Sequence, residues 1–435
     1  MKVSISDKTA PVGWGENALL ASNSEGFDIH LPIGEERSAV IQQAARKISV
    51  LGVPEVSLAG TNWTLNDQWS FVLGYLKAKH CGVIHWANTS PADTGQLDQR
   101  LRIHNWVRSM MHATPQDQSP VKLAEDTVEF LQQIAPGDIS HEIISGDDLA
   151  TQGWVGVHGV GRGSDRPPAM LRLEYCPAEC RDDPVAAVLV GKGLIYDSGG
   201  YSLKKTEHMF LMKTDMGGAA TVAAALATAI QAGLRKRIVL ILCCAENLIS
   251  GRAYKNGDIL NYKNGVSVEI ANTDAEGRVV LADGLIMAGE TGAGLVIDAA
   301  TLTGAAKIAL GNDYNAIFAL DSALQARALG YAQQENERHW ALPLEKFHQL
   351  RCPSLFADTC NSRPEPGGGN GGASNAAGFL SRFAPNDGNG WLHFDLSGSF
   401  HAADTSLYAG GASGLGVRTI ARILLEELQG QSREL

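Results

Sequence analysis

The chain has 435 residues, which is too long for one ordinary hydrophobic core and predicts roughly two or three domains. Hydrophobic residues make up 44% of the sequence and glycines number 48, a composition typical of a compact globular protein with many tight turns. The formal net charge of -11 favours solubility and works against non-specific binding to nucleic acid or to an anionic membrane.

Cysteine usage and the N-terminal segment indicate the compartment. The 7 cysteines have no spacing typical of a disulfide framework, so we expect a reducing environment. Cys176 and Cys180 lack the second cysteine or histidine pair that would complete a zinc site. Met1–Pro11 is polar and no long apolar segment follows it, so we expect no signal peptide. Every apolar stretch falls short of the roughly 20 residues that a membrane helix requires. We therefore expect a cytoplasmic protein with no membrane partner.

Residues 1–150 are expected to form a smaller N-terminal α/β domain. Five segments have the periodicity of helices or strands: the helices Glu35–Leu51, Leu65–Lys79 and Gln116–Ile134, and the strands Glu55–Leu58 and Gly82–Trp86. The histidines of this region show no i, i+4 metal spacing, and we interpret them as structural or surface residues. The stretch Gly153–Gly163, rich in glycine and valine, indicates a boundary nearby.

Residues 151–435 show a regular alternation of buried strands and helices. The expected strands are Ala186–Val190, Ile238–Ala245, Gly294–Ala300, Asn315–Leu320 and Trp391–Leu396, and the expected helices are Gly217–Ala232, Val279–Gly289 and Leu415–Leu428. This alternation predicts an α/β fold with a mixed, largely parallel sheet flanked by helices. Pro364–Gly378 is rich in glycine, and we expect it to be an ordered loop near the site.

Carboxylates follow the expected strands at the sheet edge where ligands gather in open α/β folds. Four of them come together if the strand ends converge: Asp197, Asp215, Asp274 and Glu276. Clustered carboxylates raise one another's pKa unless cations are present, and two divalent metals supply four balancing charges. Asp274 and Glu276 are two apart, so they diverge on a helix but can face one centre from a turn, which Gly277 would permit. The pattern therefore predicts a two-metal site.

Three cationic residues accompany the carboxylates. The sequence allows two interpretations of Lys192 and of Arg278, and it indicates one role for Lys204. Lys192 is either a salt-bridge partner of an aspartate or a metal ligand, which requires a neutral amine. Lys204 is placed to face a substrate, where it can stabilise a developing oxyanion. Arg278 either binds an anion near the metals or pairs with a neighbouring carboxylate.

Taken together, these residues resemble the leucyl aminopeptidase family of the cytosol aminopeptidase type, most closely its peptidase B branch. The similarity is carried by Gly191–Lys204, Asp215–Ala220, Asn272–Leu285 and Ala299–Gly304. The heptapeptide Asn272–Arg278, which reads Asn-Thr-Asp-Ala-Glu-Gly-Arg, is its most specific part. Weaker similarity extends over roughly the last two-thirds of the chain, so residues 151–435 correspond to the family's catalytic domain.

The resemblance implies an aminopeptidase that hydrolyses peptides with two divalent metal ions, Mn²⁺ or Zn²⁺. The positions that match the family's metal ligands are Lys192, Asp197, Asp215, Asp274 and Glu276, with Asp197 and Glu276 bridging the ions. In the family a metal-bridging water attacks the scissile carbonyl. Lys204 matches the residue that stabilises the gem-diolate, and Arg278 matches the one that holds a bicarbonate general base. Met212, Thr301 and Gly304 match positions lining the pocket for the first side chain, and Leu302 lies beside them. A cytoplasmic homohexamer is also implied.

Two departures from the family pattern concern substrate preference and the N-terminal region. The region before the catalytic domain is shorter than in the family's long forms. Ala412 stands where many relatives carry methionine near the pocket, so a preference for leucine does not follow.

The sequence disfavours two other functional classes. Some relatives double as nucleic-acid-binding regulators, but the acidic charge and the absence of a basic cluster in residues 1–150 argue against that role. A phosphate-binding enzyme is disfavoured because the sequence contains no Gly-x-x-x-x-Gly-Lys-Ser/Thr motif.

Overall fold

The computed structural model describes the chain except for residues 16–17, 33, 35, 80–81 and 430–435. Its packing separates two compact units. The first comprises Met1–Asn105 and Phe400–Ser413, and the second comprises Trp106–Ser399 and the segment that begins at Gly414. Residues 106–150 thus pack with the second unit, whereas the sequence predicts a boundary near residue 150. The reason is that strand β6 (Ile139–Ser145) pairs along its length with β7 (Ala169–Tyr175).

The first unit is built on a five-stranded sheet with the order β2-β3-β1-β4-β5. Its strands are β1 (Lys2–Ser6), β2 (Leu20–Ser22), β3 (Gly26–His30), β4 (Glu55–Ala59) and β5 (Val83–His85), and its helices include α1 (Arg37–Val50) and α2 (Leu65–Tyr75). All neighbouring strands run parallel except β2 and β3. The expected smaller N-terminal α/β fold is therefore confirmed. Glu35, the expected first residue of the first helix, lies outside the described residues.

The first unit also contains a segment from late in the sequence. This segment carries the two-stranded pair β17 (Phe400–His401) and β18 (Gly411–Ala412). Arg46 on α1 forms an ion pair of 3.1 Å with Asp404, and Gln42 donates to the carbonyl of Leu407 at 3.1 Å. These contacts explain why residues 400–413 group with the first unit.

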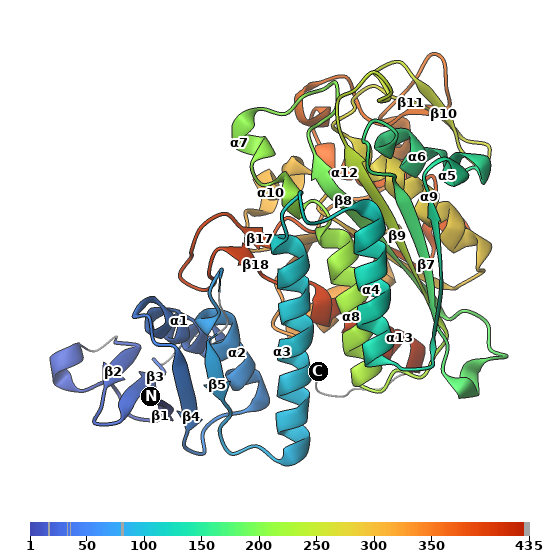
Figure 1. Cartoon of the computed structure of the whole chain (residues 1–435). Helices are drawn as coiled ribbons and strands as arrows, with labels where there is room; N and C mark the ends of the chain where they lie inside the picture. The colour runs from blue at the N-terminus through green and yellow to red at the C-terminus, as the bar shows by residue number, and fades with distance from the viewer. Residues whose placement is uncertain (16–17, 33, 35, 80–81, 430–435) are drawn as a thin grey trace. The chain divides into compact units, whose positions relative to one another are not determined.

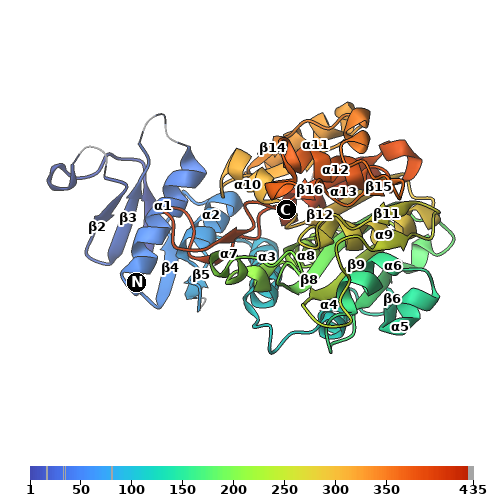
Figure 2. The ribbon, with the colours of Figure 1, turned by 90° about the horizontal axis from the view of Figure 1, so that it is seen from above.

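The second unit contains an eight-stranded sheet with the order β14-β13-β16-β12-β8-β9-β7-β6. Its remaining strands are β8 (Ala187–Asp197), β9 (Ile238–Asn247), β12 (Leu295–Ala300), β13 (Asn315–Phe318), β14 (His339–Ala341) and β16 (Trp391–Asp395). The four central strands are parallel, and Figure 2 shows β8, β12 and β16 following one another across the unit. β6, β7 and β13 make antiparallel pairs toward the edges. The predicted mixed, largely parallel sheet is confirmed.

Helices cover both faces of this sheet, and the alternation of side chains along β8 shows why. A Cβ added to Gly284 of α9 (Glu276–Glu290) would lie 2.5 Å from Val190, whereas one added to Gly191 would lie 2.6 Å from Ala219 of α8 (Gly217–Gln231). Successive residues of a strand point to opposite faces, so α8 and α9 lie on opposite sides. α8 packs against α4 (Pro120–Ile134) and α13 (Val417–Gln429) (Figure 1).

Two segments contain helices that the sequence analysis did not predict. Pro364–Gly378 is not a single loop, because α12 (Gly372–Leu380) begins within it and buries Ala376, Ala377 and Phe379. Gly153–Gly163 contains the short helix α6 (Val155–Gly161). In both segments, frequent glycines hide a helical face made of small residues.

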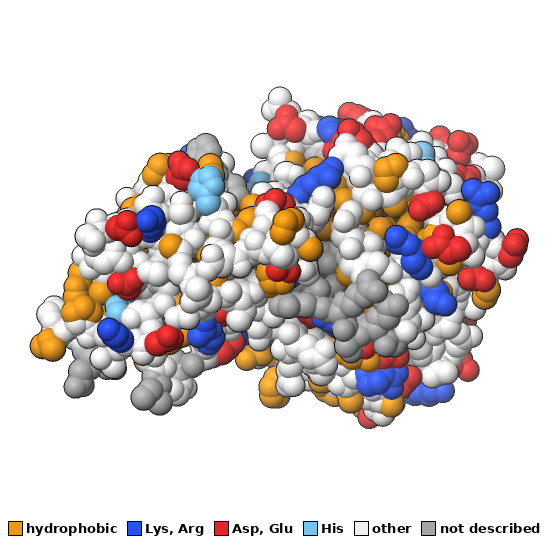
Figure 3. All heavy atoms as spheres, turned by 90° about the horizontal axis from the view of Figure 1, so that it is seen from below, with side chains coloured by type: hydrophobic (Ala, Val, Ile, Leu, Met, Phe, Trp, Pro, Cys, Tyr) orange, Lys and Arg blue, Asp and Glu red, His pale blue; other side chains and the backbone are white. Residues whose placement is uncertain are grey.

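The remaining elements are shorter or peripheral. They are α3 (Pro91–His112), α5 (Asp147–Thr151), α7 (Thr206–Met209), α10 (Gly304–Leu310) and α11 (Ser322–Gln334), and a small sheet of β10 (Ile259–Asn261), β11 (Ser267–Glu269) and β15 (Thr359–Cys360). Within the described part of the chain, each helix is too short or too polar to cross a bilayer. On the face shown in Figure 3, acidic and basic side chains are interspersed.

Candidate metal centre

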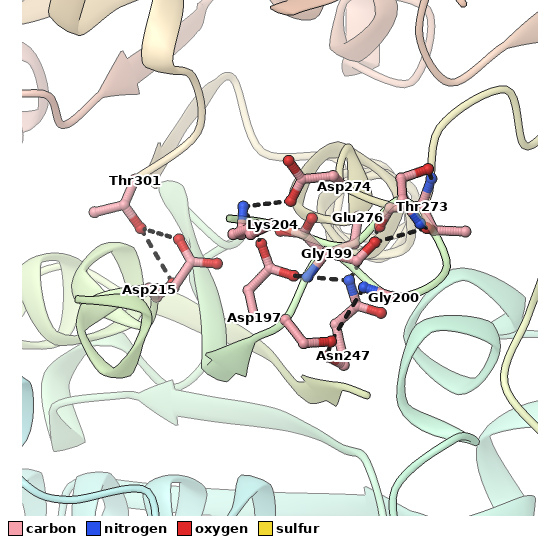
Figure 4. A network of polar contacts seen from close by, with 12 residues as sticks. Asp197, Gly199, Gly200, Lys204, Asp215, Asn247, Thr273, Asp274, Glu276 and Thr301 are labelled. Carbon is pink, nitrogen blue, oxygen red and sulfur yellow. Dashed lines mark hydrogen bonds and ion pairs between the residues drawn. The ribbon is translucent and has the colours of Figure 1, made fainter. Parts of the chain in front are cut away.

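The predicted site residues gather where β8 ends and α9 begins (Figure 4). Lys192 lies within β8 and Asp197 is its last residue, while Asp215 follows the short 3-10 helix η3 (Met212–Thr214). Asp274 occupies the turn before α9, and Glu276 is the first residue of that helix. The prediction that Asp274 and Glu276 do not share a regular helix is therefore confirmed. The N-terminal position also places the Glu276 carboxylate at the positive end of the α9 dipole.

Three of the four carboxylates form a tight buried cluster. Asp197, Asp215 and Glu276 each offer an oxygen atom, and these atoms lie within 4.8 Å of one another. Oε2 of Glu276 is buried without a hydrogen-bond partner among the described residues. Burial and the nearby Glu276 carboxylate raise the pKa of Asp197 to about 7, and burial also raises the pKa of Asp215 to about 7. A buried anionic cluster with an unpartnered oxygen fits divalent cations.

Two lysines balance part of this negative charge. Lys192 Nζ lies 2.7 Å from Asp215 Oδ2 and 2.9 Å from Glu276 Oε1. Lys204 Nζ lies 2.7 Å from Asp197 Oδ2 and also contacts Asp274 Oδ1 (Figure 4). Burial lowers the pKa of both ammonium groups, but the carboxylates outweigh it and hold each pKa above its usual value. Lys192 is thus a salt-bridge partner here, and it must lose a proton to become a metal ligand.

Arg278 lies on α9 and is buried without an ion pair to any described residue. Its Nη1 donates to the backbone carbonyl of Asn361 at 3.0 Å, and its Nε has no hydrogen-bond partner in the described part of the chain. Burial lowers the pKa of the guanidinium. The alternative pairing with Glu276 or Asp274 is not observed. Because an unpaired buried cation is costly, this arrangement favours a bound anion.

Two asparagines that the sequence analysis did not single out hold the site together. Asn247, the last residue of β9, donates from Nδ2 to Asp197 Oδ1 at 2.7 Å and to the carbonyl of Thr273 at 3.0 Å. Asn361 is fully buried and bonds to the heptapeptide from a distant part of the sequence. A single asparagine carries no sequence signal of such a role. Only the position of Asn247 at a strand end could have indicated it.

Two glycines of the site are explained by space and backbone geometry. Gly199 has a φ of +84°, and a Cβ there would lie 2.6 Å from the carbonyl of Ser202. Gly277 does not have a positive φ, so the expectation that it permits a turn is wrong. It lies in the first turn of α9, where a Cβ would come within 2.7 Å of Lys192 Nζ. A larger residue at this position would therefore have to displace the end of the Lys192 side chain.

Of the residues expected to line the substrate pocket, Thr301 contacts the cluster, and the others are close to cluster or pocket residues in space or in the sequence. The carbonyl of Thr301 accepts from Lys192 Nζ at 3.1 Å, and its hydroxyl donates to Asp215 Oδ1 at 2.9 Å. A Cβ on Gly277 would lie 2.9 Å from Leu302 Cδ1. Gly304 is the exposed first residue of α10, and Met212 is half-buried at the start of η3.

Comparison with known proteins identifies the family. The sequence profile of the cytosol aminopeptidase family, catalytic domain, matches residues 105–421. The chain belongs to the cytosol aminopeptidase family. A second profile, described only as a peptidase, matches residues 2–90. Family membership makes the chain a metallo-aminopeptidase, which is a hydrolase.

Solved structures of relatives share the architecture over nearly the whole chain. The bottromycin maturation enzyme BotP, solved in complex with Mn, is 26% identical with a TM-score of 0.85, covering 98% of this chain and 99% of its own. Cytosol aminopeptidase from Coxiella burnetii is 28% identical with a TM-score of 0.83, covering 94% and 89%. Leucyl aminopeptidase from Leishmania major, in complex with actinonin, shares the fold at 24% identity and a TM-score of 0.79, covering 92% and 81%.

The comparisons and the carboxylate cluster both support an enzyme that depends on divalent metal ions. They give no support to the nucleic-acid-binding alternative. The narrower assignment to the peptidase B branch stays a prediction.

Proposed function

We propose that the chain releases N-terminal amino acids from peptides by two-metal hydrolysis, in intracellular peptide turnover. The observation that carries this proposal is the buried cluster of Asp197, Asp215 and Glu276, in which one carboxylate oxygen lacks a partner beside two lysines. Such a cluster is costly in a folded protein unless it binds cations. The family membership directs that cation-binding chemistry to the hydrolysis of peptide bonds at the N-terminus.

Five residues are the proposed ligands of two divalent ions, Mn²⁺ or Zn²⁺: Lys192, Asp197, Asp215, Asp274 and Glu276. When bound, the ions would supply Lewis acidity toward the scissile carbonyl and lower the pKa of a water molecule. The protein's contribution is to keep four carboxylates and one amine close together in a mostly buried site. The Asp197 carboxylate is held in place by hydrogen bonds from Asn247 Nδ2 and from the backbone N–H of Gly199 at 2.8 Å.

Lys204 and Arg278 are the proposed catalytic residues. Lys204 keeps its proton at Nζ because two carboxylates surround it, so it remains a cation that can stabilise negative charge on the reacting carbonyl oxygen. The unpaired, buried guanidinium of Arg278 can bind an anion such as bicarbonate, the proposed general base.

Substrate selection is assigned to the pocket residues expected from the sequence. We propose that the first side chain of the peptide contacts Met212, Thr301, Leu302 and Gly304. A free substrate amine close to the carboxylates would be bound as part of the site, which restricts cleavage to the N-terminus. Cytoplasmic location and assembly as a homohexamer are also proposed from the family resemblance, and sedimentation velocity of the purified chain tests the assembly.

The proposed exopeptidase activity is tested with two versions of one tripeptide, Leu-Gly-Gly and its N-acetylated form. The protein is incubated with MnCl₂ and each peptide, and released leucine is measured by mass spectrometry. We expect release from the free tripeptide alone. Equal cleavage of both forms, or cleavage only at the second bond, would contradict an aminopeptidase activity.

A further inference from the structure

The side chain of Asn361 makes hydrogen bonds that define the shape of the heptapeptide, although its partners lie 86 to 90 residues away in the sequence. Its Oδ1 accepts from the backbone N–H of Ala271 at 2.9 Å and of Asn272 at 3.2 Å. Its Nδ2 donates to the carbonyl of Asn272 at 2.7 Å and of Ala275 at 3.2 Å. An asparagine amide has two acceptor and two donor positions, so this side chain uses all four.

The backbone of Asn361 fixes the catalytic arginine as well. Its carbonyl accepts from Arg278 Nη1 at 3.0 Å, and among the described residues this is the hydrogen bond that orients the guanidinium. The position of Asn361 is itself fixed, because its N–H donates to the carbonyl of Glu269 at 3.0 Å. β15, which ends just before it, pairs with β11, which ends three residues before the heptapeptide. The small sheet thus brings Asn361 to its partners.

We propose that Asn361 is a positioning residue of the active site. It fixes the turn that carries Asp274 and the first turn of α9 that carries Glu276, and it orients Arg278. This inference rests on the proposed function, because it gives Asn361 its role through the metal ligands and the anion-binding arginine. Supporting groups of this kind typically change metal affinity or activity by about 10- to 100-fold when they are altered.

The substitution Asn361→Asp separates this role from simple space filling. Aspartate has nearly the same shape, but its second oxygen cannot donate to the carbonyls of Asn272 and Ala275 and repels them instead. The matched control is Asn315→Asp. Asn315 is also fully buried and bridges backbone groups, donating to the carbonyl of Leu415 at 3.1 Å and accepting from Gly398 N at 2.8 Å. Its partners include no proposed ligand or catalytic residue.

The experiment compares the full-length wild type and both variants in three measurements. These are the Kd for Mn²⁺ by isothermal titration calorimetry, kcat and KM on leucine p-nitroanilide, and activation by added sodium bicarbonate. For Asn361→Asp we expect a Kd for Mn²⁺ about 10-fold higher, a kcat about 100-fold lower and a weaker response to bicarbonate. The Asn315→Asp variant should keep the wild-type Kd for Mn²⁺, kinetic constants and bicarbonate response. It should lose about as much thermal stability as Asn361→Asp.

Two results would overturn the inference. One is a folded Asn361→Asp variant with an unchanged Kd for Mn²⁺ and an unchanged bicarbonate response. The other is an Asn315→Asp variant that loses Mn²⁺ affinity and the bicarbonate response as strongly as Asn361→Asp does. If Asn361→Asp does not fold, Asn361→Ala, which leaves room for water, is measured in the same way against the same criteria. Failure of the proposed function is distinguishable, because the wild type itself would then release no amine from leucine p-nitroanilide with Mn²⁺.

Discussion

Lys192 Nζ lies 2.8 Å from Oδ1 and 2.7 Å from Oδ2 of Asp215, so one buried ammonium group contacts both oxygens of one buried carboxylate. Both side chains are almost inaccessible to solvent. In the protein without metal, the lysine therefore neutralises a charge that a divalent ion would otherwise balance. Metal binding through Lys192 requires the amine to lose its proton, which couples metal affinity to pH.

Replacing Lys192 should destabilise the metal-free protein strongly. In Lys192→Met the carboxylates of Asp215 and Glu276 lose their cation inside the protein, and such a loss costs about 3–5 kcal/mol. Urea denaturation in EDTA measures the free energy of unfolding. The control is Lys2→Met, which removes an exposed pair with Glu25 and should cost roughly 0–1 kcal/mol. Equal effects of the two substitutions would contradict this account of the buried pair.

Lys204→Ala should lose turnover while still binding metal. The variant removes the cation proposed to stabilise the reacting oxygen, and loss of one such group lowers kcat by about 10²–10³-fold. Steady-state kinetics and calorimetry with MnCl₂ measure the two properties separately. The neighbouring exposed Lys205 provides the control, since Lys205→Ala should leave both unchanged. A Lys204→Ala enzyme with an unimpaired kcat would refute the catalytic role.

Asp283, which is not part of the metal centre, should make the stability of the protein depend on pH. It lies on α9, accepts from Val157 N at 2.8 Å, and burial raises its pKa to about 8. Because this pKa lies above that of the unfolded chain, folding takes up a proton between about pH 4 and pH 8. The contribution to stability is complete below about pH 4 and is lost as the pH rises through 8.

Asp283→Asn should remove this dependence because asparagine stays neutral. We expect the free energy of unfolding of the wild type to fall relative to the variant by at most about 1.4 kcal/mol per pH unit within that window. Chemical denaturation at pH 5, 6, 7 and 8 measures both proteins. Parallel pH profiles would show that Asp283 is not protonated in the folded protein.

Much of this fold and site could be predicted from the sequence because the relevant signals are local. The apolar first half of β8, the apolar strand β9 and the spacing inside the heptapeptide depend on a few consecutive residues. The α12 helix could not be foreseen, because its glycines conceal a face that only tertiary packing stabilises. Asn361 and Asn247 were missed since their role lies in contacts with residues far away in the sequence.

The loop that follows β12 should control selectivity for the first side chain. Asp395, at the end of β16, accepts from Leu302 N at 3.1 Å, and Thr303 Oγ1 donates to its other oxygen at 2.6 Å. Thr303→Val removes that donor, so the ratio of kcat/KM for leucine and alanine anilides should change by roughly 10-fold. Thr303→Ser keeps the hydroxyl and should behave as the wild type. An unchanged ratio in Thr303→Val would place the selectivity elsewhere.

The central claim, peptide hydrolysis with divalent metal ions at the carboxylate cluster, is tested most directly by removing and restoring the metal. Release of amine from leucine and glutamate p-nitroanilides is measured before chelation, after complete chelation, and after addition of Mn²⁺, Zn²⁺ or Co²⁺. The account predicts that activity disappears on chelation and returns with at least one of these ions, whereas Asp197→Asn and Glu276→Gln variants stay inactive. Activity that survives complete removal of metal would contradict it.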